Sequence, residues 1–105
     1  MSTAAVQYES SFAIARDHPS LEGHFPGNPL VPGVLLLERA LECAEEKTGH
    51  PLAVRAIVQA KFVAPLKPDE LARVELRYSP TELRFAVRHA ERLIAQAIFA
   101  LDPPP

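Results

Sequence analysis

The sequence predicts an α+β fold in which antiparallel strands pack against one long helix. Residues 34–48 have the length and composition of a four-turn helix. Residues 52–101 largely alternate apolar and polar side chains with the period of two that marks strands. This order leaves the apolar face of a sheet free to wrap the helix. We expect the 105 residues to form a single domain, residues 1–105.

Composition and charge exclude several functional classes. Hydrophobic residues make up 48% of the chain and charged residues 23%, as in folded globular proteins. The net charge of -2 gives no sign of a nucleic-acid partner. No apolar run reaches the roughly 18 residues of a membrane span, and the first residues do not resemble a signal peptide, so we expect a cytoplasmic protein.

The size of the chain and its single cysteine have structural consequences. A domain this short buries only about 60 to 65% of its unfolded surface, so we expect it to associate with a second copy. Cys43 cannot form an internal disulfide. On a helix rich in Leu and Ala, it is expected to be a small buried hydrophobic residue.

The first strand is predicted at residues 12–16, with Phe12 and Ile14 on one face. Residues 1–10 are polar without a period and are expected to be frayed. A turn at residues 17–20 should end this strand, and an ordered loop should follow up to Val31. Three of the four glycines and three of the eleven prolines lie between residues 23 and 33, which indicates a backbone held in one shape.

The predicted helix ends naturally at Gly49. Its polar side carries Glu38 together with four further charged residues. At 100° per residue, its apolar arc contains Val34, Leu36, Leu37, Ala40, Leu41, Cys43 and Ala44.

Four strands are predicted after the helix. The strand over residues 52–62 should place its even-numbered residues on one face, and strands over 72–78 and 83–88 should follow it in a half-buried meander. The last strand, residues 93–101, is apolar on both faces. It should therefore be central in the sheet or covered on its second side.

The loop and the helix start contain the groups for acid–base chemistry. A helix that begins at Gly33 presents free N–H groups and the positive end of its dipole, and glycine lets a ligand approach the backbone closely. His24 can accept a proton near neutral pH and Glu38 can donate one. These groups suit removal of a proton next to a carbonyl. A surface histidine and a solvated surface acid would explain the same residues, and His18, His50 and His89 are best explained as surface or packing residues.

Two segments resemble a known family. Residues 24–38 read H-F-P-G-N-P-L-V-P-G-V-L-L-L-E, which resembles the signature of the bacterial 3-hydroxyacyl-acyl-carrier-protein dehydratases (FabA/FabZ-like): H-F-P-G-x-P, two residues, P-G-V, and an acid fourteen positions after the histidine. Residues 61–71 resemble that family's K-F-x-x-P-x-x-P-G-D-x-L segment, although the glycine before the acid is missing. The short N-terminal segment is similar to the compact dehydratases of aryl-polyene or other specialised acyl pathways.

The resemblance implies a hotdog fold, an antiparallel sheet wrapped around one helix, paired edge to edge in a homodimer. It implies that His24 is the base, that Glu38 of the other subunit is the acid, and that the Gly33 N–H binds the thioester carbonyl. The implied reaction removes water from a 3-hydroxyacyl group on acyl carrier protein to give the trans-2-enoyl thioester, in fatty acid or aryl-polyene-type biosynthesis. No metal or other cofactor is implied.

Further contacts follow from the same resemblance. Substrate contacts are expected from Phe25, Pro26, Pro32, Val34 and Leu37. A basic rim of Arg16, Arg55 and Lys61 should meet the acidic carrier protein. Two alternatives stay open at this point: an acyl thioesterase on the same fold, and a non-catalytic acyl-binding or partner subunit of a dehydratase.

Overall fold

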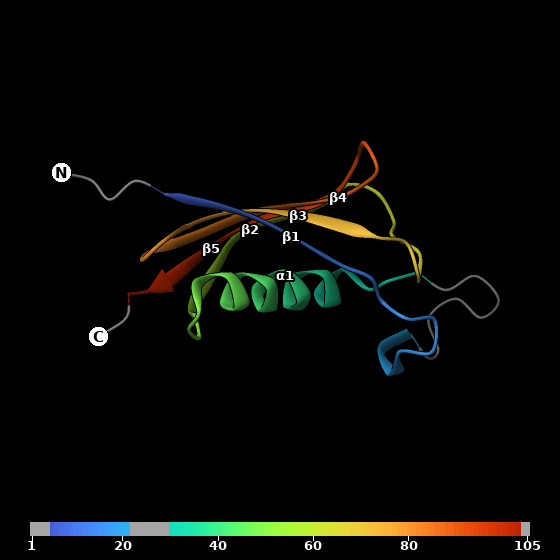
Figure 1. Ribbon diagram of the computed structural model, residues 1–105, viewed down its shortest axis with the longest axis horizontal. Coiled ribbons are helices and arrows are strands. Elements are labelled where there is room, and N and C mark those ends of the chain that lie inside the picture. The colour runs from blue at the N-terminus through green and yellow to red at the C-terminus, as the bar shows by residue number, and fades with distance from the viewer. Residues whose placement is uncertain (1–4, 22–29, 104–105) are drawn as a thin grey trace.

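The computed structural model describes residues 5–21 and 30–103, so His24, Phe25 and Pro26 lie outside the described residues. The described residues form one long helix and five strands, with a single 3₁₀ turn at Pro19–Leu21 (Figure 1). The elements in chain order are β1 (Val6–Phe12), α1 (Gly33–Thr48), β2 (Ala53–Phe62), β3 (Ala72–Ser79), β4 (Glu82–His89) and β5 (Arg92–Asp102).

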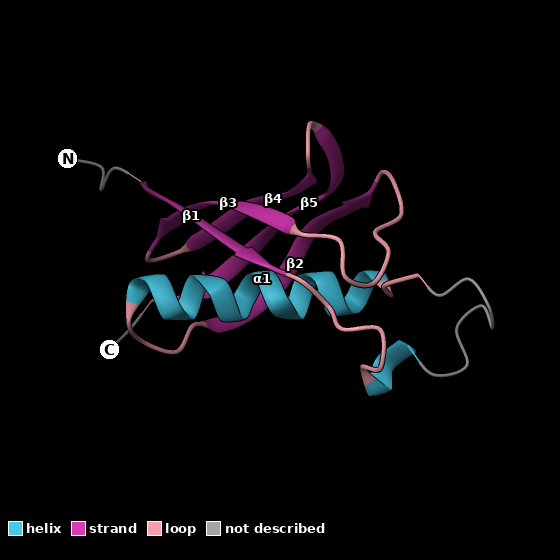
Figure 2. Ribbon diagram, turned by 45° about the vertical axis from the view of Figure 1, so that its right-hand side comes forward, coloured by secondary structure: helices cyan, strands magenta, loops and turns pink. Residues whose placement is uncertain are grey.

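The five strands form one antiparallel sheet in the order β1-β3-β4-β5-β2, and α1 lies along one face of it (Figure 2). The predicted meander of β2, β3 and β4 is wrong, because β2 pairs only with β5 at the far edge. The connection over residues 63–71 contains two prolines and is too long for a hairpin turn, so it can cross from the edge strand β2 to β3, next to the opposite edge. β5 has a strand on each side, as its apolar faces predicted.

β1 begins six residues earlier than predicted. It pairs with β3 from Val6 opposite Tyr78 to Phe12 opposite Ala72, so residues 6–10 are a strand and not a frayed end. An edge strand is held by the backbone of one neighbour and needs few apolar side chains, which is why its polar sequence did not reveal it. Phe12 and Ile14, which were predicted to share one face of this strand, are both buried, but Ile14 lies beyond the end of β1.

Helix α1 ends as predicted. Gly49 adopts a left-handed conformation with φ 82°, and its N–H donates to the Glu45 carbonyl at 2.9 Å. Cys43 is buried. The structure corrects the apolar arc at two positions, since Val34 is 62% exposed and Leu35 is buried. Val34 lies at the border of the arc, where periodicity alone cannot decide which side is covered, whereas Leu35 lies on the side of the charged residues, so the period did not predict its burial.

The core lies between α1 and the inner faces of β3, β4 and β5. The predicted alternation of β3 and β4 is confirmed, with Arg and Glu side chains on the outer face. Phe85 and Phe99 meet edge to face, with ring centroids 5.2 Å apart. The inner residues of β3 and β4 are Ala72, Val74, Leu76, Leu83, Phe85 and Val87, all buried.

β2 is exposed along all of its ten residues. Its pairing with β5 shifts at two places, between Val54 and Ala56 and between Ile57 and Gln59. Each such irregularity changes the phase of the alternation by one residue, so the single apolar face predicted for residues 52–62 is wrong. The outer edge of β2 has no pairing strand among the described residues, and Ile57 and Val58 are exposed on it.

A turn explains how the chain accommodates the missing family glycine. Asp69 adopts a left-handed conformation with φ 68°, which a glycine would accept more readily but which Asp tolerates. The Glu70 carboxylate accepts a hydrogen bond from the Lys67 N–H at 2.7 Å and lies 3.1 Å from His89 Nε2. The second ring nitrogen of His89 lies 2.8 Å from the Leu71 carbonyl oxygen, so His89 is a packing residue, as predicted.

Replacing Ala90 with Gly should stabilise the protein. Ala90 is the first of two residues that connect β4 to β5, and its φ is 52°, where a Cβ is unfavourable. We expect the free energy of unfolding, measured by urea denaturation, to rise by about 0.5 to 1 kcal/mol. The matched variant Glu91→Gly should give no such gain, because Glu91 has no positive φ. A destabilised Ala90→Gly variant would contradict the left-handed turn.

Candidate active site

A pocket of about 330 Å³ lies at the start of α1. Two chain segments form it, and the Val31 N–H joins them by donating to the Leu66 carbonyl at 2.9 Å. These are the same two segments that carry the family-like motifs. The lining is largely apolar and consists of Leu30, Val31, Pro32, Gly33, Leu36, Phe62, Val63, Ala64, Pro65 and Leu66.

Backbone donors without an acceptor among the described residues lie at this pocket. Pro32 precedes the helix in an extended conformation, and its carbonyl accepts hydrogen bonds from the N–H groups of Leu35 and Leu36 at 3.1 and 3.4 Å. The N–H groups of Gly33 and Val34 have no acceptor within the described part of the chain. Together with the helix dipole, they favour an oxygen that gains negative charge in the pocket.

Gly33 is in close contact with the ring of Phe62. A Cβ at residue 33 would lie 2.7 Å from Phe62 Cε1 and 2.9 Å from Phe62 Cζ. Real Cβ atoms do not approach other atoms so closely, so any side chain at this position would displace the ring. A side chain at residue 33 would therefore have to push the exposed Phe62 ring aside.

Glu38 faces away from the pocket of its own chain. It is exposed, and it makes no hydrogen bond or ion pair with any described residue. Leu36, which lines the pocket, lies two residues earlier on the helix, a rotation of about 200°. Glu38 therefore projects from the opposite side of α1, as its position on the polar arc predicted.

The predicted substrate-contacting residues divide into three groups. Pro32 lines the pocket with Gly33. Val34 is exposed and Leu37 is buried in the core, and neither lines the pocket. Phe25 and Pro26, with His24, lie outside the described residues. Sequence reasoning missed Phe62, although the K-F pair of the second motif pointed to it.

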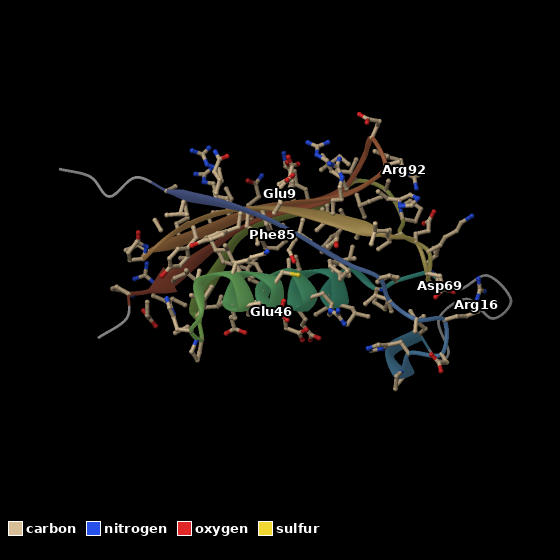
Figure 3. All side chains as sticks on the ribbon, in the orientation of Figure 1. Glu9, Arg16, Glu46, Asp69, Phe85 and Arg92 are labelled. Atoms are coloured by element: carbon tan, nitrogen blue, oxygen red, sulfur yellow. The ribbon has the colours of Figure 1, made fainter. Side chains whose placement is uncertain are left out.

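The three predicted carrier-contacting cations have different surroundings. Arg16 is paired with Asp69 at 3.8 Å, and both lie at the same end of the molecule as Arg92 (Figure 3). Arg55 is separated from Phe62 by about 20 Å of β2. Lys61 directly precedes Phe62 and is exposed.

Two further cations near the pocket were not predicted. Lys67 follows the pocket residue Leu66, and Arg92 Nη2 donates to the carbonyl of Pro65 at 3.5 Å. Within the described residues, the side chains of Lys61, Lys67 and Arg92 have no acidic partner. We call these three residues the cationic rim.

The outer face of the sheet carries a second hollow of about 330 Å³. Arginine and glutamate from β3 and β4 line it, and it contains none of the predicted site residues. Within this face, the hydrogen bond from Arg84 to the Glu82 carboxylate raises the pKa of the guanidinium. Unlike the pocket at the helix start, this hollow is lined by charged side chains of β3 and β4 and does not include Gly33.

The described residues contain neither a metal-binding cluster nor a membrane-spanning helix. No group of three or more His, Cys, Asp or Glu residues among them could hold a metal ion. None of the described helices combines the length and the apolar character that crossing a membrane requires.

Comparison with known proteins identifies the family. Residues 1–98 match the family model described as ApeI-like, ApeI dehydratase. The chain belongs to the ApeI-like dehydratase family. A curated relative from Zymomonas mobilis, the 3-hydroxyacyl-[acyl-carrier-protein] dehydratase FabZ, is 31% identical over 97 residues, which cover 84% of this chain and 61% of that protein. This ApeI-like chain spans about 60% of the length of the curated relatives it matches.

Solved structures share the fold. A chain of the dehydratase heterocomplex ApeI:P from Xenorhabdus doucetiae superposes with a TM-score of 0.81 at 20% identity, covering 91% of this chain and 87% of that one. A protein from Erwinia carotovora gives the same TM-score at 25% identity, covering 98% and 88%. The hotdog fold is thereby confirmed. A probable thioesterase from Bartonella henselae gives 0.67 at 17% identity, covering 95% and 90%, so the fold alone does not identify the reaction.

Proposed function

We propose that this ApeI-like protein removes water from a 3-hydroxyacyl group carried on acyl carrier protein and releases the trans-2-enoyl thioester. The observation that carries the proposal is the Gly33 amide at the end of an apolar pocket, which has no acceptor among the described residues. It lies in a chain whose motif supplies His24 and Glu38 at the spacing of the family. Membership of a dehydratase family and the FabZ relatives support the same reaction class.

The proposed mechanism is an elimination. His24 takes the proton from C2 while the Gly33 N–H and the helix dipole stabilise the enolate-like thioester oxygen. The electron pair forms the C2–C3 double bond, the C3–O bond breaks, and Glu38 gives its proton to the departing hydroxyl, which leaves as water. His24 then loses its proton and Glu38 regains one. No step requires a metal or an organic cofactor, and this remains a prediction.

The opposite orientations of the pocket and Glu38 support a site shared between subunits. The β2 edge is apolar and unpaired, whereas the other edge, β1, carries polar residues such as Gln7 and Glu9. Pairing β2 with a second copy would cover Ile57 and Val58 and close the sheet edge. We therefore propose a homodimer in which His24 and Gly33 of one chain work with Glu38 of its partner. The similar ApeI:P structure is a heterocomplex. The competing proposal is therefore that this chain pairs with a different dehydratase-fold chain.

The deciding assay for the reaction follows the product. The protein is incubated with carrier-bound 3-hydroxyacyl groups that differ in length and conjugation, and the products are identified by mass. Loss of 18 Da from the acyl group, the mass of one water, supports dehydration, whereas release of a free thiol would show the thioesterase alternative. We propose an aryl-polyene-type or fatty acid pathway, and the chain length that turns over fastest will distinguish them. A cytoplasmic location remains a prediction.

Charge reversal at the cationic rim should weaken the use of carrier-bound substrate. Acyl carrier protein is expected to present an acidic surface to Lys67 and Arg92 beside the pocket. The double variant Lys67→Glu/Arg92→Glu should raise KM for the carrier-bound substrate by about tenfold or more and reduce its salt dependence. Turnover of a small-molecule thioester should change by less than about twofold.

A matched control has the same change in charge away from the pocket. Arg77 and Arg84 lie opposite each other on β3 and β4, toward the other end of these strands. The variant Arg77→Glu/Arg84→Glu should leave KM for the carrier-bound substrate close to that of the wild type. Equal effects of the two double variants would show that net charge, and not the rim, governs carrier binding.

A further inference from the structure

We infer that Phe62 determines which acyl groups reach the Gly33 amide, and that its ring selects against substrates substituted at C2. This inference rests on the proposed function and adds a specificity-determining residue to it. Phe62 is the last residue of β2, and it belongs to the pocket lining together with Gly33 and Leu36. Among the described residues of that lining, it carries the only aromatic side chain.

The ring occupies the space beside the free amide. Three of its atoms, Cδ1, Cε1 and Cζ, lie 2.7–3.0 Å from the position that a Cβ of residue 33 would take. A thioester oxygen that accepts a hydrogen bond from the Gly33 N–H must bring its carbonyl carbon and C2 into the same region. The ring therefore forms one wall of the space that receives C2, the atom that loses its proton.

The ring is supported from only one direction. Phe62 is 54% exposed, and β2 has no strand beyond it among the described residues. The ring packs on the helix start, where the absence of a side chain at Gly33 makes room for it. The Phe62 ring can make room for an extended acyl chain by a small rotation. A second substituent on C2 would have to displace the ring from Gly33. Such a clash of one methyl group in a formed pocket corresponds to about tenfold or more in kcat/KM.

The test compares two substrates that differ by one methyl group. The wild type, Phe62→Ala and Phe62→Leu receive a 3-hydroxyacyl pantetheine thioester and its 2-methyl analogue, which still carries one proton on C2. We expect the wild type to favour the unbranched substrate by about tenfold or more in kcat/KM, and Phe62→Ala to reduce the preference to about threefold or less. Phe62→Leu should fall between them, and it is the variant of choice if Phe62→Ala does not fold.

Leu71→Ala is the matched control. Leu71 is 55% exposed and lines none of the pockets described above, so this variant loses an equally exposed apolar side chain elsewhere. It should keep the wild-type preference. If Phe62→Ala and Phe62→Leu keep the wild-type preference, or if Leu71→Ala loses it as strongly as they do, the inference is wrong.

A binding experiment separates this inference from the proposed reaction. Unreactive amide analogues of the two thioesters are titrated into the wild type and Phe62→Leu, and the backbone N–H resonance of Gly33 is followed by NMR. The Gly49 N–H, which is bonded within the helix end, is the reference. Discrimination in binding that depends on Phe62, in a protein that dehydrates neither substrate, would overturn the proposed function and support the inference. Dehydration without any Phe62-dependent discrimination would overturn the inference and support the proposed function.

Discussion

The variants Glu38→Gln and His24→Ala should each lower kcat for dehydration by about 10² to 10⁴, because each removes one partner of the proton transfer. Glu38 is exposed and makes no hydrogen bond or ion pair with a described residue, so its replacement should not unfold the chain. The measurements are single-substrate kinetics and a thermal unfolding curve for each variant. The neighbouring acid Glu42, paired with Arg39 at 3.4 Å, provides the control, and Glu42→Gln should keep near-wild-type turnover.

Mixing the two inactive variants tests whether the site is shared. If His24 of one chain works with Glu38 of the other, a mixed dimer contains one intact site and one doubly altered site. Random exchange makes about half of the dimers mixed, so about a quarter of the wild-type activity should return. If both residues of a site come from the same chain, no activity returns on mixing. Near-full turnover of either single variant would contradict the assigned mechanism itself.

The double variant Ile57→Lys/Val58→Lys should convert the proposed dimer into inactive monomers. If two copies pair through β2 about a two-fold axis, the substituted patch of one chain faces the same patch of its partner. Each added lysine then loses its hydration and is repelled by the lysines of the partner. Light scattering should show the mass fall from about 23 kDa, twice the mass of the 11.5 kDa chain, to that of one chain. Dehydration should fall to the level of Glu38→Gln, because the partner's acid is lost.

The opposite sheet edge supplies the control for assembly. Gln7 and Glu9 lie on β1, an edge strand of the same sheet, so Gln7→Lys/Glu9→Lys places two lysines on an edge that is already polar. This variant should remain a dimer. A wild-type protein that is monomeric alone, and that assembles only with a second dehydratase-fold chain, would refute the homodimer and support a heterocomplex.

Local sequence patterns correctly predicted helix α1 and the alternation of β3 and β4. The helix and its stop at Gly49 follow from composition and glycine chemistry, and the alternation of β3 and β4 follows from one buried and one solvated face. Strand order was not predictable, because it depends on the path of residues 63–71 across the sheet. The polar strand β1 was missed because backbone pairing with β3, and not apolar burial, holds it in place.

The candidate site was predictable in part. Gly33 and Pro32, which the motif singled out, line the pocket, and the exposure of Glu38 followed from the helical period. The roles of these residues remain predictions. The contact of Phe62 with Gly33 depends on how β2 ends against the helix, which no local pattern contains. Lys67 and Arg92 were missed because they come from two loops that meet only in the folded sheet. The placement of His24 remains a prediction.

The two irregularities of β2 bear on how the protein avoids aggregation. A long, straight and apolar edge strand is a template for unlimited strand addition, and in this chain the exposed edge carries Val54, Ile57 and Val58. The irregularities flanking Arg55 and Val58 bend and twist the strand, so no straight segment of more than a few residues is offered. A strand with the same bends would fit this edge far better than an arbitrary flat one. The two irregularities, which also obscured the sequence pattern, would thus restrict the β2 edge to pairing with one matching strand. They would keep newly synthesised chains from forming open-ended fibres.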